Sequence, residues 1–353
     1  MWQSFRSGGA AGKKGGAVLL GLLAAFPLLA IVIPLLVILL LACWVVYDNS
    51  RIVVDKQTFS MPSMEKSMDG MAVLQMSDIR GRQFGAEGES LDSVLKGEEY
   101  DLVVMTGDLA GKDGDLTGFY QALDYFAEQG KRVYFITGET DPAAEEMRGD
   151  GSFGPAEWVI KAQETGAVYL DVPQKLYEGE TSLWLMPASA LVLDSQSPIA
   201  SLDKRLADET IDAETAQSLL YKKERYQAFA QEMESRQQND LTIMLSHLPC
   251  LDKELQAEST TAIFGEADLI LAGHHLGGQI CLPVVGALKA DNDLLPRGGW
   301  FPETRYLTGL NEVNATYQYV STGLGVDWEG WLDFRTCNPP KVSIITLTRK
   351  VDA

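Results

Sequence analysis

The side chains best suited to chemistry in this sequence are its histidines, of which there are three. His274 and His275 come directly after the short apolar run 269–272, and His247 follows a second run closely. Glycines beside the pair, at 273, 277 and 278, let a ligand approach the backbone. Imidazoles at the mouth of a buried strand are typical of sites that hold a metal ion or a phosphate group. Any chemistry that needs imidazole must therefore use these three residues.

Acidic side chains follow three earlier apolar runs in the same way, at Asp78, Asp108 and Glu139. In open α/β sheets, ligands bind at the carboxyl ends of the strands, so we expect these carboxylates to converge with His247 and His274. Carboxylates together with imidazoles suit Mn²⁺, Fe or Zn²⁺, metals that activate water and polarise phosphoryl oxygens. Taken singly, Asp78 could instead cap a helix, and Asp108 could form an Asx turn.

The elements that must position these residues alternate between strand-like and helix-like segments. Such alternation predicts parallel strands joined by crossover helices, and the sequence beyond residue 278 is β-rich. The predicted strands are 71–76, 101–105, 132–136, 167–170, 182–186, 241–245, 269–272, 280–285, 317–320 and 342–347, and the predicted helices are 90–96, 116–129, 157–164 and the amphipathic 209–235.

The stretch 17–47 contains no charged residue. It exceeds the roughly 20 residues that a helix needs to cross a bilayer, which predicts a transmembrane helix. Only basic side chains precede it, at Arg6, Lys13 and Lys14, so the positive-inside rule places the N-terminus in the cytoplasm and the main domain outside. A cleaved signal peptide is an alternative, although the run is about twice the usual length. A second alternative is a lipoprotein processing site, because residues 40–43 resemble a lipobox.

Composition excludes some classes of function. The net charge of −20 argues against a nucleic-acid groove and against electrostatic binding to an anionic membrane surface. The four cysteines form no CxxC pair, so neither a zinc ribbon nor a redox motif is indicated. The predicted organisation is a cytoplasmic segment 1–16, the transmembrane helix 17–47, a linker 48–69 and one folded domain 70–353.

Five short blocks of the sequence resemble, in order, the signature of the calcineurin-like metallophosphoesterases: D-x-H, G-D, G-N-H-D/E, a lone H and G-H-x-H-G-G-Q. The chain is most similar to their membrane-anchored bacterial phosphodiesterase branch, because residues 319–325 and 334–340 resemble the closing segments of that branch. The resemblance covers residues 70–348 and implies a four-layer αββα sandwich of two mixed sheets, with hydrolysis of phosphate esters by metal-activated water. The five blocks are S-D-I-R at 77–80, G-D at 107–108, G-E-T-D at 138–141, S-H-L-P at 246–249 and G-H-H-L-G-G-Q at 273–279.

The resemblance also shows where this sequence departs from the family. One metal of the family is held by the aspartate and histidine of D-x-H, the bridging aspartate and the last histidine of G-H-x-H. Asp78 and Asp108 remain here, but the two histidine positions are Arg80 and Leu276. A guanidinium does not ligate a cation and leucine has no donor atom, so this metal site is predicted to be lost. Arg80 could place its own charge there instead.

The second metal of the family would be held by Asp108, Glu139, His247 and His274, and the resemblance therefore implies one divalent ion rather than two. The catalytic histidine of the family is Thr140 in this sequence, and losing such a group costs on the order of 10²–10⁴ in rate. His275 is the histidine that could replace it.

Two functions follow from this pattern. The first is a phosphoesterase in which Asp78 and Arg80 contact the substrate phosphate or the attacking water. The alternative is a pseudoenzyme that binds an extracytoplasmic ligand or protein without turnover. The substrate of either is not readable from the sequence.

Overall fold

The computed structural model describes residues 11–61, 64–85, 88–188, 198–208, 210–252, 267–290, 295–313, 316–327 and 333–349, with side chains from Leu29 onward. The chain divides into two units, Met1–Tyr47 and Asp48–Ala353, and each is described by itself.

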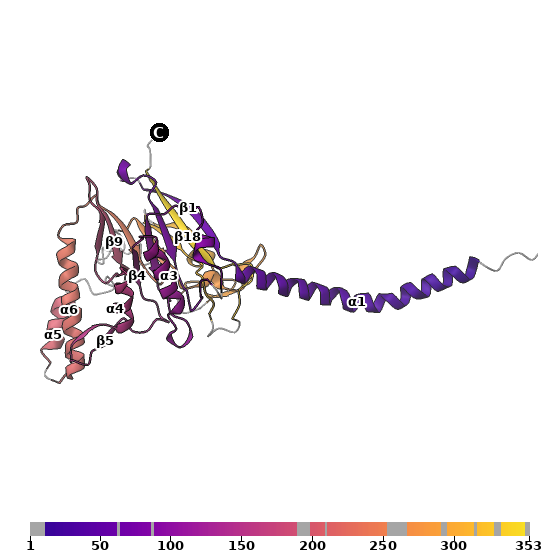
Figure 1. Ribbon diagram of the computed structural model, residues 1–353, viewed down its shortest axis with the longest axis horizontal. Helices are drawn as coiled ribbons and strands as arrows, with labels where there is room; N and C mark the ends of the chain where they lie inside the picture. Colours follow the sequence, from indigo (N-terminus) through magenta and orange to yellow (C-terminus); the bar gives the residue numbers. More distant parts are fainter. Residues whose placement is uncertain are drawn as a thin grey trace, which may run out of the picture. The chain divides into compact units, whose positions relative to one another are not determined.

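The first unit contributes most of one long helix, α1 (Ala11–Ser50), shown in Figure 1. Within it, Leu29–Ser50 is apolar and long enough to cross a membrane. Its mean hydropathy is 3.2, and no part of its 18-residue apolar window is buried within the structure. By length and composition this segment is a candidate membrane span, and a signal sequence passes the same test.

The second unit is built on two six-stranded mixed sheets. In the first, β2, β3, β4 and β7 run parallel, β18 pairs antiparallel with β2, and β1 lies parallel beside β18 at the edge. In the second, β9, β10, β11 and β17 run parallel between antiparallel edge strands. In spatial order the first sheet is β1 (Val53–Met61), β18 (Lys341–Arg349), β2 (Ala72–Met76), β3 (Leu102–Thr106), β4 (Val133–Ile136) and β7 (Val168–Tyr169), and the second is β16 (Gly309–Val313), β17 (Thr316–Val320), β11 (Leu269–Ala272), β10 (Leu241–Leu245), β9 (Leu183–Pro187) and β8 (Gln174–Tyr177).

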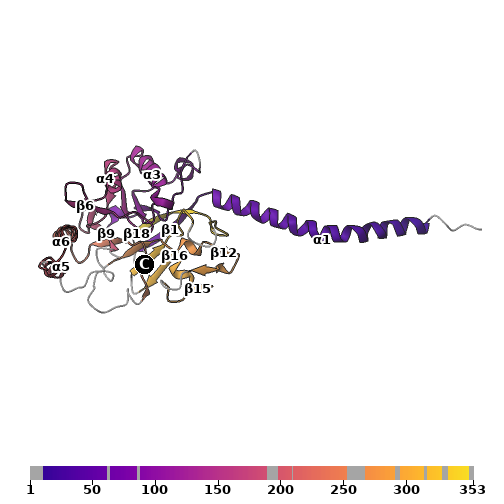
Figure 2. The same cartoon turned by 90° about the horizontal axis from the view of Figure 1, so that it is seen from below.

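The two sheets pack face to face around a shared apolar core to which Val104 and Ile243 belong. Helices α3 (Thr117–Glu128) and α4 (Glu157–Glu164) cover the outer face of the first sheet, with Phe119 and Val159 in a second core (Figure 2). On the outer face of the second sheet, Phe229 of α6 (Ala213–Met233) packs against the cluster that includes Met244. The predicted sandwich of two mixed sheets between helices is therefore confirmed.

The remaining elements are short. They are α2 (Leu91–Val94), α5 (Pro198–Leu206), which packs on α6, the 3₁₀ turns Lys66–Met68, Lys112–Gly114, Leu276–Gly278 and Thr304–Tyr306, and the small strands β5 (Glu145–Met147), β6 (Phe153–Pro155), β12 (Cys281–Leu282), β13 (Gly286–Ala287), β14 (Lys289–Ala290) and β15 (Gly299–Trp300).

Two predicted features differ from the structure. The stretch 48–69, expected to be a linker, contains β1, which pairs along nine residues with β18. It belongs to the compact unit that begins at Asp48. The strand expected over 280–285 is instead β12, two residues long, followed by a turn into β13. Both differences have the same physical reason, because pairing with a partner strand, rather than local apolar periodicity, decides where a strand begins and ends.

Candidate metal and phosphate site

The side chains predicted to do chemistry lie on loops that leave the carboxyl ends of central strands. Asp78 follows β2, Asp108 follows β3, His247 follows β10 and His274 follows β11. Asp78, Asp108 and His274 have φ angles of 50°, 53° and 76°. Non-glycine residues adopt this left-handed region rarely, and such strain gathers at functional sites. These backbone turns allow loops from both sheets to bring their side chains to one place.

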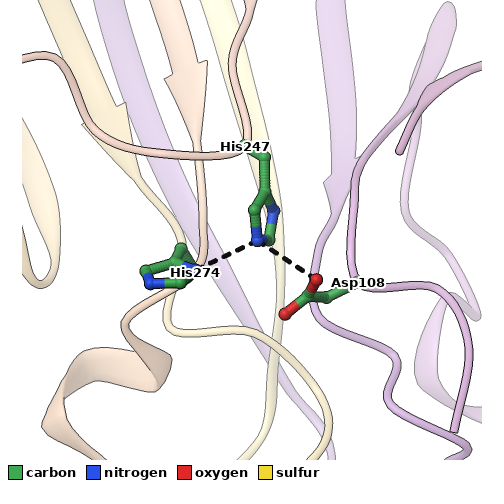
Figure 3. Close-up of side chains that lie close together, drawn as sticks. All are labelled: Asp108, His247 and His274. Carbon is green, nitrogen blue, oxygen red and sulfur yellow. Dashed lines mark hydrogen bonds and ion pairs between the residues drawn. The ribbon is translucent and has the colours of Figure 1, made fainter. Parts of the chain in front are cut away.

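Asp108, His247 and His274 form a cluster in which one potential ligand atom of each lies within 4.8 Å of the others (Figure 3). His247 Nε2 lies 3.2 Å from Asp108 Oδ1 and 3.1 Å from His274 Nδ1. On its other side, His247 Nδ1 donates to the carbonyl oxygen of Thr106 at 2.9 Å. That bond fixes the tautomer and aims Nε2 at the cluster, as partners of metal-ligating histidines do. One carboxylate and two imidazoles fit a divalent transition metal.

The charges of the cluster are strongly coupled. Burial lowers the pKa of His247, but the hydrogen bond to Asp108 and the charges of Asp78 and Asp108 outweigh it and raise that pKa to about 9. Burial and the neighbouring His247 lower the pKa of His274 to about 4. Burial raises the pKa of Asp108, yet His247 and Arg80 hold it well below its usual range. The Asp108 carboxylate therefore stays charged.

Arg80 lies beside this cluster, and only 8% of its side chain is exposed. Its Nη2 donates to Asp108 Oδ2 at 2.5 Å, and its Nε lies 3.9 Å from Asp78 Oδ1. A third carboxylate, Asp327, lies 3.6 Å from Nη1. The guanidinium thus faces the two carboxylates between which the family resemblance implies the lost metal.

Asp78 holds the loop of His274 in place. Its two carboxylate oxygens both lie 3.1 Å from the backbone nitrogen of His274, which donates to them, and Oδ2 also accepts from Ser77 Oγ at 2.6 Å. Asp78 is fully buried. Within the described residues it is not part of the three-residue cluster.

The other predicted site residues differ in how far their side chains are exposed and in how they contact the cluster. Glu139 is exposed and lies outside the three-residue group in the described part of the chain, so its role as a ligand stays a prediction. Thr140 donates its backbone N–H to Asp108 Oδ1 at 3.0 Å. The ring of His275 is half-buried and meets that of His274 edge-on, with centroids 4.8 Å apart.

Two glycines of the motif blocks are required by close packing. A Cβ at Gly107 would lie 2.7 Å from His247 Nδ1, and at φ +88° an L side chain would be strained. A Cβ at Gly273 would lie 2.7 Å from Asp78 Oδ2. Only glycine lets these two loops approach the buried carboxylate and imidazole so closely.

Sequence reasoning did not single out Asp141, although it stands in the third motif block. Its Oδ1 accepts from the amides of Leu109 and Ala110, both at 2.7 Å, and its Oδ2 accepts from Gly138 N at 2.8 Å. Asp141 therefore ties the loop after β3 to the loop after β4. The signal that could have found it is the final acidic position of the family's G-N-H-D/E block.

Arg335, in the closing segment 334–340, was also missed as a site residue. It is fully buried and donates to carbonyl oxygens of Gly323 at 3.0 Å, of Leu276 at 3.3 Å and of Thr322. Asn338 Nδ2 donates to the same Leu276 oxygen at 2.7 Å. Together they hold the turn Leu276–Gly278, which follows the two adjacent histidines.

Comparison with known proteins shows the family of this chain. A family profile described as calcineurin-like phosphoesterase matches residues 71–277, more than half of the chain. The chain therefore belongs to the calcineurin-like phosphoesterase family. Among solved structures it is similar to the phosphopantetheinyl hydrolase PptH from Mycobacterium tuberculosis, at 12% identity and a TM-score of 0.34, over 73% of this chain and 91% of that one. No curated protein matches it.

Proposed function

We propose that this protein hydrolyses phosphate esters with a single divalent metal ion held by Asp108, His247 and His274. The observation that carries the proposal is the convergence of one carboxylate oxygen and two imidazole nitrogens beside the Arg80 guanidinium. Family membership supports phosphoester hydrolysis as the reaction class. Bound there, a divalent ion would activate water and polarise a phosphoryl oxygen.

The protein's own groups would divide the remaining work. Arg80 would hold phosphate oxygens, because a guanidinium matches phosphate geometry and remains charged at every physiological pH. Asp78 keeps the His274 loop in register through the His274 amide. Thr140 would orient the Asp108 carboxylate through its backbone N–H. Glu139 completes the proposed ligand set from the exposed side, and His275 is the proposed proton donor.

The same proposal includes the location of the protein. The candidate span Leu29–Ser50 and the basic residues Arg6, Lys13 and Lys14 support a single-pass protein of a bacterial cell membrane with a cytoplasmic N-terminus. The phosphoesterase unit would then act outside the cytoplasm on a phosphate ester whose identity the site does not define.

A second candidate function is binding without turnover. It is favoured by the ion pair of Arg80 with Asp108, because a guanidinium already occupies one side of the carboxylate. Thr140 and Leu276 at histidine positions of the family favour it further. In this function the site would hold a phosphorylated ligand or a protein partner.

Metal content and hydrolysis of a chromogenic phosphodiester separate these functions. We expect the full chain in detergent to bind about one Mn²⁺ and to hydrolyse the ester with Mn²⁺ present. His247→Ala should lose both properties, since it removes a ligand. The matched variant His275→Ala should keep the metal and slow hydrolysis by about 10²–10⁴ if His275 is the proton donor. A stoichiometric metal without hydrolysis, across several metals and esters, would leave binding as the function. A chain that binds no divalent metal would contradict the proposed site itself.

A further inference from the structure

Exposed apolar side chains gather in one short part of the compact unit. Among the described residues from Asp48 onward, seven large apolar side chains are exposed, and five of them lie between positions 282 and 301. Val284 is 108% exposed and Trp300 64%. A concentration of this kind marks an interaction surface, whereas single exposed apolar residues are ordinary. The five are Leu282, Val284, Val285, Trp300 and Phe301.

These residues occupy two neighbouring hairpins, β12–β13 and β14–β15. Leu288 joins the hairpins, because its N–H donates to Ile280 O at 2.8 Å and its carbonyl accepts from Phe301 N at 2.9 Å. Residues 282–285 form the turn of the first hairpin, and residues 300–301 lie at the base of the second, beside Leu288. We call these two groups together the apolar tips. Figure 2 shows β12 and β15 on the same side of the second sheet.

The backbone at the tips holds the side chains outward at a conformational cost. Val284 has φ +69° and Phe301 has φ +56°. For a β-branched or bulky side chain this left-handed conformation is an outlier, and strain of this kind is commonly found at binding sites. Neither side chain is buried in return, so their placement is not explained by packing within the unit.

The hairpins begin close to the point where the candidate membrane span enters the compact unit. Asn49, the second-last residue of that span, belongs to this unit and exchanges two hydrogen bonds of 2.7 Å with the backbone of Arg335. The next residue, Thr336, is bonded in turn to Cys281, at 3.0 Å through its carbonyl and at 2.7 Å through its hydroxyl. Leu282, the first residue of the apolar tips, comes directly after Cys281.

Chain length keeps the start of β1 close to the end of α1. Only Arg51 and Ile52 separate the end of α1 from the start of β1, so at most about 11 Å lies between the Cα atoms of Ser50 and Val53. Tryptophan is enriched at the membrane–water interface. The charged residues between positions 282 and 301 are Lys289, Asp291, Asp293 and Arg297, so this stretch carries no net charge.

We propose that the apolar tips insert into the interfacial region of the same bilayer that α1 crosses and form a second membrane contact of the compact unit. Insertion of apolar side chains, rather than net charge, supplies the attraction, which agrees with an acidic chain. The surface fits a bilayer better than a second copy of the chain, because two copies that each carry a net charge of −20 repel one another. The proposal does not depend on phosphoester hydrolysis, but it rests on the proposed membrane location of the protein.

Nitroxide depth measurements on the full chain test this contact. The chain would carry Cys43→Ser, to remove the exposed thiol of α1, and would be reconstituted in phosphatidylcholine nanodiscs. One variant adds Val284→Cys, and its matched control adds Leu220→Cys, a 42% exposed apolar position on α6. The Cys43→Ser chain alone gives the background from the remaining thiols. Because Val284 is fully exposed, its replacement does not endanger the fold.

At position 284 we expect a loss of collisions with a water-soluble nickel chelate and a gain of collisions with oxygen dissolved in the bilayer, relative to position 220. Equal accessibility to the nickel chelate at both positions would overturn the proposal. Protection of position 284 that appears only when two copies share a disc would also overturn it, since the occupant would then be a second chain. Protection in discs that hold one copy supports the membrane contact.

Discussion

At the scale of single residues, Asp108 is the centre of the site. Its Oδ1 faces His247, while its Oδ2 accepts from the Arg80 guanidinium. The Asp108 carboxylate therefore faces a potential metal ligand, His247, with one oxygen and the guanidinium of Arg80 with the other. Asp78 and Asp108 are both fully buried, so the positive charge of Arg80 stabilises two carboxylates that would otherwise repel each other. The charge of Arg80 thus lies beside the two carboxylates between which the family resemblance implies a metal.

Replacing Arg80 tests this substitution of a guanidinium for a metal. Arg80→Gln removes one partner of a buried ion pair, which costs about 3–5 kcal/mol, and we expect a lower melting temperature. Added Mn²⁺ should raise the melting temperature more in Arg80→Gln than in the unmodified chain, because a divalent cation can then compensate Asp78 and Asp108. Thermal unfolding with and without Mn²⁺ measures both effects.

The control for that experiment is Arg82→Gln, which removes a neighbouring guanidinium bonded to the carbonyls of Asn49 and Ser50 rather than to the site. It should be destabilised without gaining a response to Mn²⁺. If Mn²⁺ raises the melting temperature of Arg80→Gln no more than that of the unmodified chain, the Arg80 guanidinium does not occupy a position where a metal ion could bind.

Some of this residue-level arrangement was predictable and some was not. Asp108, His247 and His274 converge as their positions after parallel strands predicted, because the carboxyl ends of β3 in the first sheet and of β10 and β11 in the second lie at the same end of the sandwich. Asp141 and Arg335 bind backbone amides and carbonyls of distant loops. Such partners are invisible in a sequence, since any residue offers the same backbone groups.

At the scale of elements, the strands carry a second row of aspartates at the ends opposite the site. Asp101 precedes β3 and accepts from Ala72 N of β2. Asp240 precedes β10 and accepts from Ser182 N beside β9, while Asp268 precedes β11 and accepts from Thr242 N of β10. Each aspartate therefore ties the start of its own strand to the neighbouring strand. Acidic residues at the beginning of the strands fix the pairing between neighbouring strands, while acidic residues at the opposite end belong to the candidate site.

The contribution of Asp240 to the pairing of β9 with β10 can be tested through the pH dependence of the free energy of unfolding. Burial raises its pKa, but the amides of Gln237 and Ser182 and the indole of Trp184 outweigh this and lower it below the ordinary value. A carboxylate with a lowered pKa favours the folded state above its unfolded pKa of about 3.9, and this stabilisation is lost as the pH falls through the folded pKa.

Asp240→Asn should therefore unfold more easily at pH 7, by about 1–2 kcal/mol for weakened hydrogen bonds that include a buried indole. Its stability should also fall less steeply than that of the unmodified chain below about pH 4. Urea unfolding at a series of pH values measures both, with Asp124→Asn, an exposed position on α3, as the control. If the stability of Asp240→Asn falls below about pH 4 as steeply as that of the unmodified chain, this carboxylate does not tie β9 to β10.

The sequence predicted the central elements better than the peripheral ones. The strands β2, β3 and β4 are almost continuous apolar runs, because they are packed on both faces, while helix α3 has apolar residues along one stripe. The polar run 55–58 interrupts the apolar residues of β1, which lies at the edge of its sheet, and such a sequence predicts a linker. The hairpins β12–β13 and β14–β15 consist of two-residue strands, which are too short to leave any period.

At the scale of the whole compact unit, its two ends are joined. β1 and β18 pair in parallel from Val53 with Lys341 to Met61 with Arg349, and β18 separates β1 from β2. The hydroxyl of Tyr319 adds a link to the other sheet by donating to Asp55 Oδ2 at 2.7 Å. No local pattern in a sequence indicates pairing between strands so far apart, which is why the strand predictions leave β1 out.

The part of the chain needed for folding follows from this pairing. Ile52, Phe59 and Met61 of the β1 region are buried, and at about 1.5–3 kcal/mol each they contribute roughly 5–9 kcal/mol. This is comparable to the whole stability of an ordinary domain, about 5–15 kcal/mol. We therefore expect a chain that begins at Asp48 to unfold cooperatively in urea, and one that begins at Gly70 to lack a cooperative transition and to aggregate through the uncovered edge of β18. Circular dichroism during urea unfolding and limited proteolysis compare the two. Equal unfolding midpoints would mean that the sandwich is complete without β1 and that the stretch before residue 70 is a linker after all.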